Sequence, residues 1–140
     1  MKKLFMSFVV LFVTALFVTQ KANAQVRTLT TDMFLSNLWD ENNKRFTNDK
    51  LIVIEFYATW CRPCYTMRPI FESVAREYYY YNFYSVDIDN EPELAKFFEL
   101  KSIPTIAYIP PRDDGRYLLS MGVIEKWQVI KYMKESINHR

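Results

Sequence analysis

The fold of this chain is decided by the stretch Leu51-Ile52-Val53-Ile54-Glu55-Phe56-Tyr57-Ala58-Thr59-Trp60-Cys61-Arg62-Pro63-Cys64. Its first part, residues 51–57, is short, apolar and rich in β-branched side chains, which is typical of a strand buried on both faces. From Cys61 onward the apolar residues recur at helical spacing and share one face, which holds Cys64, Met67, Phe71, Val74, Ala75 and Tyr78. The stretch therefore predicts a buried strand that leads directly into a helix, with two cysteines at the junction.

Alternating strands and helices are predicted on both sides of this stretch. Before it, we expect a short strand or loose arm over residues 25–30, then a helix capped by Asp32 with Phe34, Leu35 and Leu38 on its apolar face, and a polar loop over 42–50. After it, the patterns predict strands at 82–87, 105–109 and 116–121, a turn at Asp113-Asp114-Gly115, and helices at 92–100 and 127–137. This order predicts one α/β domain with a central mixed β-sheet flanked by helices on both faces.

The N-terminus has the three-part layout of a secretory signal peptide. Met1-Lys2-Lys3 is a positive start, residues 4–18 are nearly all apolar, and Ala22-Asn23-Ala24 is a small-x-small cleavage site. We expect residues 1–24 to be removed and residues 25–140 to fold in the periplasm or outside the cell. The alternative is an uncleaved membrane anchor, although the apolar run of 15 residues is shorter than the roughly 20 that a spanning helix needs.

Charge and composition narrow the class of protein. The formal net charge is +2, and it falls to −1 without residues 1–24, because three lysines and no acidic residue leave with that segment. Neither value indicates the basic surface of a nucleic-acid-binding protein. Half of the residues are hydrophobic, so a domain of this size can bury a core.

Cys61 and Cys64 are the two cysteines of the chain. A bridge between them closes so small a loop that it would stabilise the fold little, which disfavours a purely structural disulfide. Cys61 falls at the start of the predicted helix, where unpaired N–H groups and the neighbouring Arg62 favour a thiolate. Cys64 lies one turn further, on the core face. The spacing thus predicts an exposed attacking thiol and a buried resolving thiol.

A metal site is not expected, because structural zinc takes about four ligands and the only histidine, His139, is at the far end of the chain. Nothing in the sequence indicates a cofactor.

Segment 57–64 resembles the active-site segment of the thioredoxin family. Ile103-Pro104-Thr105 is similar to the cis-proline loop of that family, Pro69 matches the proline of its active-site helix, and Gly122 matches its glycine after the hairpin. The resemblance extends over residues 31–138. It implies a thioredoxin fold over 25–140 and a monomeric thiol–disulfide oxidoreductase that acts on protein disulfides.

The same resemblance implies a role for each site residue. Cys61 would be the nucleophile and Cys64 the resolving thiol of a redox-active disulfide. Pro104 would be a cis-proline packed against that disulfide, and the backbone of Ile103 would bind an extended substrate. The predicted substrate-binding residues, which line an apolar groove around Cys61 or separate the cysteines, are Trp60, Arg62, Pro63, Ile103, Pro104 and Val123.

Glu55 is the only charged residue in the strand over 51–57. Burial disfavours an ionised carboxylate, so we expect the pKa of Glu55 to be raised. By resemblance it stands where the family has a buried Asp that exchanges protons with the resolving thiol, which makes it a third catalytic residue. The alternative is a solvated Glu55 near the sheet edge. The family often has a Lys near this acid, and Ser85 occupies that position here.

The direction of electron flow is predicted from the residues around the cysteines. Pro63 resembles the reducing members of the family, whereas oxidising members have a His there that stabilises the thiolate. Ile103 also resembles the residue found in the reducing members, whereas Arg62 favours the oxidising direction because it stabilises the thiolate. We therefore predict a reductase that receives electrons from a membrane thiol carrier. The alternatives are a reductant of apocytochrome c cysteines and, in another class, a non-catalytic binding module with a structural disulfide, which a buried Cys61 would favour.

Overall fold

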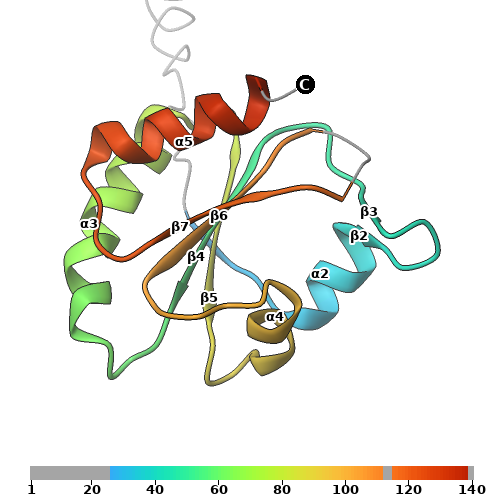
Figure 1. Cartoon of the computed structure of the whole chain (residues 1–140), viewed down its shortest axis with the longest axis horizontal. Helices are drawn as coiled ribbons and strands as arrows, with labels where there is room; N and C mark the ends of the chain where they lie inside the picture. Colours follow the sequence, from blue (N-terminus) through green and yellow to red (C-terminus); the bar gives the residue numbers. More distant parts are fainter. Residues whose placement is uncertain (1–25, 112–114, 139–140) are drawn as a thin grey trace, which may run out of the picture.

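Five strands form the central sheet of the computed structural model, which describes residues 26–111 and 115–138 (Figure 1). The elements are β1 (Arg27–Thr28), α2 (Thr31–Asn37), β2 (Trp39–Asp40), β3 (Arg45–Phe46), β4 (Ile52–Tyr57), α3 (Arg62–Glu77), β5 (Asn82–Asp87), α4 (Pro92–Phe97), β6 (Thr105–Ile109), β7 (Leu118–Met121) and α5 (Lys126–Asn138). The sheet order is β1-β5-β4-β6-β7, and β2 and β3 form a separate pair. Apart from that pair, the predicted order of elements is confirmed.

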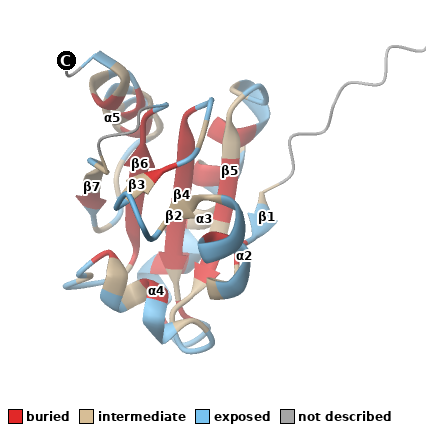
Figure 2. Cartoon of the chain, turned by 90° about the vertical axis from the view of Figure 1, so that its right-hand side faces the viewer, coloured by how far each residue is buried: buried red, intermediate tan, exposed pale blue. Residues whose placement is uncertain are grey.

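The sheet is mixed because β4 has one parallel and one antiparallel neighbour. β4 pairs with β5 in parallel and with β6 in antiparallel orientation, and β6 continues antiparallel to β7. A central strand must be covered on both faces, and every residue from Ile52 to Phe56 is buried. Figure 2 shows the buried strands in the middle, with helices on either side. The predicted architecture is therefore confirmed.

Alternation along β4 divides the core into two layers. Ile54 and Phe56 pack on one face with residues of α2 and α4, such as Phe34 and Leu94. Val53 packs on the other face with residues of α3 and α5, a cluster that includes Met67, Phe71, Val74, Val129 and Met133. Successive side chains of a strand point to opposite faces, so Glu55 belongs to the layer under α3 and α5.

The first helix differs in two details from its prediction. The N-cap of α2 is Thr30, whose side-chain oxygen accepts a hydrogen bond from the backbone N–H of Met33, while Asp32 lies in the first turn. The predicted cap at Asp32 is therefore wrong. Phe34 is fully buried, but Leu35 is 49% exposed. A helix of 7 residues rests on the sheet by a narrow stripe, and Leu35 falls beside it.

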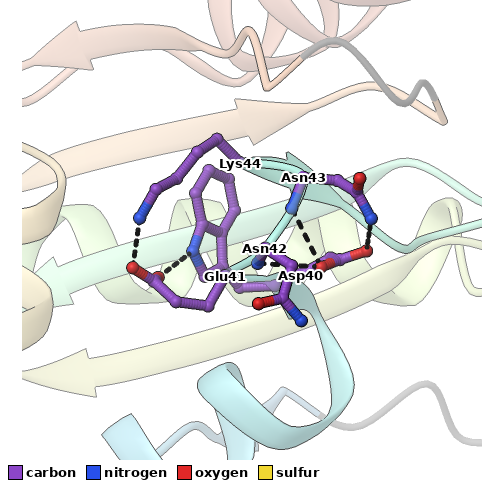
Figure 3. Close-up of polar contacts among 6 residues, drawn as sticks. Asp40, Glu41, Asn42, Asn43 and Lys44 are labelled. Atoms are coloured by element: carbon purple, nitrogen blue, oxygen red, sulfur yellow. Dashed lines mark hydrogen bonds and ion pairs between the residues drawn. The ribbon is translucent and has the colours of Figure 1, made fainter.

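The polar segment 42–50 is not the simple loop that we expected. β2 and β3 form a hairpin, and Phe46 is buried against the core. The turn is held by side chains: Asp40 accepts hydrogen bonds from the backbone N–H groups of Asn42 and Asn43, and Glu41 pairs with Lys44 (Figure 3). Such local bonds from Asp to backbone favour a turn, and a single buried aromatic residue gave too weak a pattern to predict the strands.

The remaining differences concern element ends. β7 begins at Leu118 rather than at residue 116. α4 ends at Phe97 rather than at residue 100, because Glu99 has a φ of 49°, which is outside the helical region. The predicted signal peptide (residues 1–24), the turn residues Asp113 and Asp114, and His139 lie outside the described residues. Within the part of the chain that is described, no helix combines the length and apolarity needed to cross a membrane.

Candidate active site

Cys61 and Cys64 form a disulfide at the N-terminus of α3. Cys61 is the N-cap of this helix, and its sulfur accepts a hydrogen bond from the backbone N–H of Cys64, with 3.3 Å between nitrogen and sulfur. The predicted position of Cys61 at the start of the helix is confirmed. We expect this N–H group and the helix dipole to favour the thiolate of Cys61 once the bond is reduced.

The expected contrast in exposure between the two cysteines is wrong. Cys61 is 3% exposed and Cys64 is 2% exposed. The disulfide draws both sulfurs under the same cover, in which Tyr57, Ala58 and Ile103 pack against the pair. A buried Cys61 is what we expected of a binding module, so exposure in the oxidised form does not by itself identify an enzyme.

Strand register brings the other predicted residues to the same end of the sheet. Phe56, near the end of β4, is opposite Thr105, and Thr105 is opposite Met121. The residues just before β6 and just after β7 therefore lie beside the start of α3. The Ile103–Pro104 peptide bond is cis, and the Pro104 carbonyl accepts a hydrogen bond of 2.8 Å from the N–H of Gly122. The predicted cis-proline is confirmed.

The predicted substrate-binding residues differ in exposure. Trp60, Arg62, Pro63 and Val123 are exposed, and Ile103 is half-buried against the disulfide. Exposure of Trp60 reaches 67%, yet its indole N–H donates a hydrogen bond of 2.8 Å to Asp89. The surface around the disulfide thus presents apolar side chains that nothing in the described residues covers, as a protein-binding surface requires.

Tyr65 is a site residue that sequence reasoning missed. It follows Cys64 in α3, is 60% exposed, and donates a hydrogen bond of 2.6 Å to the carbonyl of Thr59. This bond ties the segment before Cys61 to the first turn of α3. A single tyrosine on the exposed side of a helix leaves no signal in the pattern of apolar residues.

Glu55 lies in the interior of the sheet. It is 1% exposed and faces Ser85 on β5 and Ile106 on β6. Its Oε1 atom has no hydrogen-bond partner among the described residues. Burial raises the pKa of Glu55 to about 7, partly offset by the charge of Arg68 and reinforced by that of Glu72. The predicted burial and raised pKa are confirmed, and the alternative of a solvated Glu55 at the sheet edge is wrong.

Arg68 is a second residue that the sequence did not single out. Its guanidinium lies over the ring of Tyr57, 4.4 Å from the ring centroid. An arginine on a helix is ordinarily a solvated surface residue, so the sequence gave no reason to connect it with Glu55. The structure places this cation next to the end of β4, on the side of the sheet that Glu55 faces.

A cavity of about 530 Å³ lies along α5, away from the disulfide, and its described lining residues are Trp127, Ile130, Lys131, Lys134, Glu135 and Asn138. None of them belongs to the predicted site. A substrate of the cysteines would therefore bind to the surface at this end of the sheet rather than in the cavity along α5.

The mixed sheet, the Cys-x-x-Cys disulfide at a helix start and the adjacent cis-proline define a thioredoxin-fold dithiol protein. A sequence profile described as thioredoxin matches residues 25–135. Thioredoxin of Borreliella burgdorferi is 35% identical over 102 residues, which cover 70% of this chain and 86% of the relative. Thioredoxin of Mycoplasmoides gallisepticum is 38% identical over 95 residues, which cover 67% and 92%. The chain belongs to the thioredoxin family.

Solved structures agree with the fold. The crystal structure of chloroplastic thioredoxin z aligns with a TM-score of 0.67 at 22% identity, over 80% of this chain and 94% of that one. At this identity the likeness concerns the fold alone. Family membership and the disulfide together make the protein a protein-disulfide oxidoreductase. This evidence is stronger than the burial of Cys61 in the oxidised state, which by itself favoured a binding module.

Proposed function

We propose that this protein reduces disulfides of exported proteins, with Cys61 as the nucleophile and Cys64 as the resolving thiol. The observation that carries the proposal is the position of Cys61 at the N-cap of α3, where the Cys64 N–H donates to its sulfur. Donors fixed at a sulfur stabilise the thiolate, and the thiolate is the attacking species. Pro63 between the cysteines supports the reducing direction, because it cannot stabilise the thiolate further as a histidine does.

The reaction consists of two thiol–disulfide exchanges. The Cys61 thiolate attacks one sulfur of the substrate disulfide, which forms a mixed disulfide and releases the other substrate sulfur as a thiolate. The Cys64 thiolate then attacks the Cys61 sulfur, which restores the Cys61–Cys64 bond and releases the second substrate thiolate. The substrate gains two electrons and two protons. The protein loses two electrons and the proton of Cys64, and the second proton comes from water, because Cys61 reacts as a thiolate.

Glu55 supports the second exchange by taking the proton of Cys64. Its carboxyl is buried, its Oε1 is unpartnered and its pKa is raised to about 7. A group that titrates near neutrality can both accept and return a proton under working conditions. Glu55 lies on the α3 side of β4. Arg68, whose charge has the largest effect on the pKa of Glu55 among neighbouring charges, is one helical turn beyond Cys64.

Export and the electron donor complete the proposal. The layout of residues 1–24 supports secretion into an oxidising compartment. A reductase in such a compartment must be re-reduced from the cytoplasmic side, so a membrane thiol carrier is the donor that fits. The exposed apolar side chains of Trp60 and Val123 suit contact with the chains of protein substrates and of this donor.

Reduction of a model protein disulfide tests the assignment of the two thiols. We expect Cys61→Ser to abolish turnover and Cys64→Ser to accumulate mixed disulfides that survive on a non-reducing gel. In the reduced protein, Cys61 should be alkylated first, with a pKa below the roughly 8.5 of a free thiol. Faster alkylation of Cys64 than of Cys61 at neutral pH would contradict these roles.

A further inference from the structure

α3 presents a row of three side chains beyond the N-cap that includes both the resolving thiol and two charges. Cys64, Arg68 and Glu72 follow at intervals of four residues, so they lie along one side of the helix. Their exposure increases in this order: Cys64 is buried, Arg68 is half-buried and Glu72 is exposed. Arg68 therefore sits at the boundary between the core under α3 and the solvent.

β4 presents Glu55 and Tyr57 to this side of the sheet. Residues two apart on a strand point to the same face. The guanidinium of Arg68 lies 4.4 Å from the centroid of the Tyr57 ring. A cation over an aromatic face is attracted by the ring and keeps a defined place. Among the described residues no carboxylate is paired with Arg68 within 4.0 Å, and Glu72, one turn further on, lies 3.9 Å from Arg76.

The surroundings of Glu55 contain few other charges that could offset its own. Glu55 is 1% exposed and has an unpartnered Oε1. Two charges act on the pKa of Glu55, those of Arg68 and Glu72 on α3, and Arg68 is the cation of the two. The other polar or titratable groups toward this side of the sheet include Tyr57 on β4, Ser85 and Asp87 on β5, Tyr108 on β6 and Tyr132 on α5. The remaining cations of the two helices are Arg62, Arg76, Lys126, Lys131 and Lys134.

We propose that Arg68, held on the ring of Tyr57, is a positioning residue that stabilises the ionised carboxylate of Glu55. The inference rests on the proposed role of Glu55 as the proton acceptor for Cys64. Arg68 need not touch substrate or either sulfur. Its positive charge stabilises the ionised form of a carboxyl that burial disfavours, and the Tyr57 ring fixes the distance at which the charge acts. The direction of its effect on the pKa of Glu55 agrees, since Arg68 lowers a value that burial raises.

The titration of the Glu55 carboxyl can be followed directly by carbon NMR of the oxidised, full-length mature protein, with Glu55→Gln to assign the signal. We expect Arg68→Gln to raise the midpoint by about one pH unit, the lower end of what an opposite charge nearby supplies. Tyr57→Leu should raise it by less, because the guanidinium stays but is no longer held. Arg68→Lys should restore most of the wild-type midpoint.

Lys131→Gln is the control, because it removes an exposed positive charge whose partner is Glu135 on α5 rather than Glu55 or Glu72. It should leave the midpoint of Glu55 unchanged. In the reduced protein, the inflection in the pH profile of mixed-disulfide resolution should shift upward in Arg68→Gln by the same amount as the NMR midpoint. A merely structural role of Arg68 would alter the rate at all pH values without moving the inflection.

The outcomes separate the two proposals. If Arg68→Gln leaves the Glu55 midpoint where it is in the wild type, this inference is overturned, whatever Glu55 does in catalysis. If the midpoint moves but Glu55→Gln resolves mixed disulfides at the wild-type rate, the inference stands and the proposed role of Glu55 fails. Should Arg68→Gln not fold, Tyr57→Leu carries the same test, and an unmoved midpoint there contradicts the inference.

Discussion

Glu55 is a single buried carboxyl whose burial follows from the sequence and whose pKa bears on the chemistry of the site. A carboxyl inside a strand of apolar residues is costly to ionise, and the structure leaves its Oε1 without a partner. Its pKa is raised from 4.5 to about 7, chiefly by burial. The folded protein holds the proton of the Glu55 carboxyl more tightly than the unfolded chain does. The contribution of this proton to the free energy of unfolding is therefore complete below about pH 4.5 and is lost as the pH rises through 7.

The substitution Glu55→Gln tests this linkage. The neutral amide does not titrate, so the variant should gain stability relative to the wild type as the pH rises. Between about pH 5 and pH 8 the gain should amount to about 2–3 kcal/mol, since one pKa unit corresponds to about 1.4 kcal/mol. Urea unfolding of the oxidised proteins at both pH values measures it. Glu93→Gln, which removes an exposed carboxylate from α4 on the other face of the sheet, is the control, and an equal gain there would remove burial as the cause.

At the scale of elements, helix starts determine where functional groups lie. Cys61 is the N-cap of α3, so the unpaired N–H groups of the first turn lie beside the disulfide. Thr30 is the N-cap of α2, and Thr31, the first residue of this helix, donates hydrogen bonds from its backbone N–H and its hydroxyl to the carboxylate of Glu91. Glu91 is the N-cap of α4, so this carboxylate connects the starts of two helices on the same face of the sheet.

Because Thr30 and not Asp32 is the N-cap of α2, the two side chains should contribute differently to the free energy of unfolding. Thr30→Ala removes the side-chain oxygen that accepts from the Met33 N–H and should destabilise the protein by about 1 kcal/mol. Asp32→Ala removes only a charge near the positive end of a short helix and should cost about 0.3 kcal/mol. Chemical denaturation of both variants at one pH compares them. A larger loss for Asp32→Ala would return the cap to the position that the sequence suggested.

At the scale of the whole molecule, the site is assembled from segments that are far apart in the chain. The cysteines follow β4, the cis-proline precedes β6 and Gly122 follows β7. The antiparallel register of β4, β6 and β7 brings the three segments to one end of the sheet. The redox properties therefore belong to the folded domain rather than to the Cys-x-x-Cys segment alone.

The reduction potential of the Cys61–Cys64 pair is the property that tests the reducing direction. We expect a value above that of thioredoxin, about −270 mV, and far below that of a strong oxidase, about −120 mV. Arg62 is exposed, and an exposed ion pair supplies about 1 kcal/mol or less, so Arg62→Gly should lower the potential by about 20 mV. Equilibration against glutathione measures both proteins. A value near −120 mV would identify a disulfide donor instead of a reductase.

Export of the protein is a prediction at the scale of the whole chain, and it rests on the sequence of residues 1–24. We expect the protein to be exported and to begin at Gln25, because the positive start, the apolar run and Ala22-Asn23-Ala24 have the layout of a signal peptide. N-terminal sequencing after expression of the chain with residues 1–24 present measures this. Recovery of a chain with Met1 intact in the membrane fraction would favour the alternative of an anchor.

By itself, the sequence determined the architecture and the position of the disulfide. The buried strand 51–57 and the change of period at Cys61 sufficed for the centre of the sheet and for the disulfide position. These features are local, since periodicity is a property of neighbouring residues. The cis-proline followed from the resemblance of Ile103-Pro104-Thr105 to the thioredoxin family. The raised pKa of Glu55 could also be predicted from neighbouring residues, because a single charged residue within an apolar strand is expected to be buried.

Only the tertiary structure decided what depends on contacts between distant residues. The burial of Cys61 follows from Ile103 and Ile88 packing on the disulfide, and the place of Arg68 follows from the packing of α3 on β4. The buried Phe46 of the β2–β3 hairpin belongs to the same group. A helix position shows which face a side chain occupies but not what the opposite element places against it, and that is where the electrostatics of this site are set.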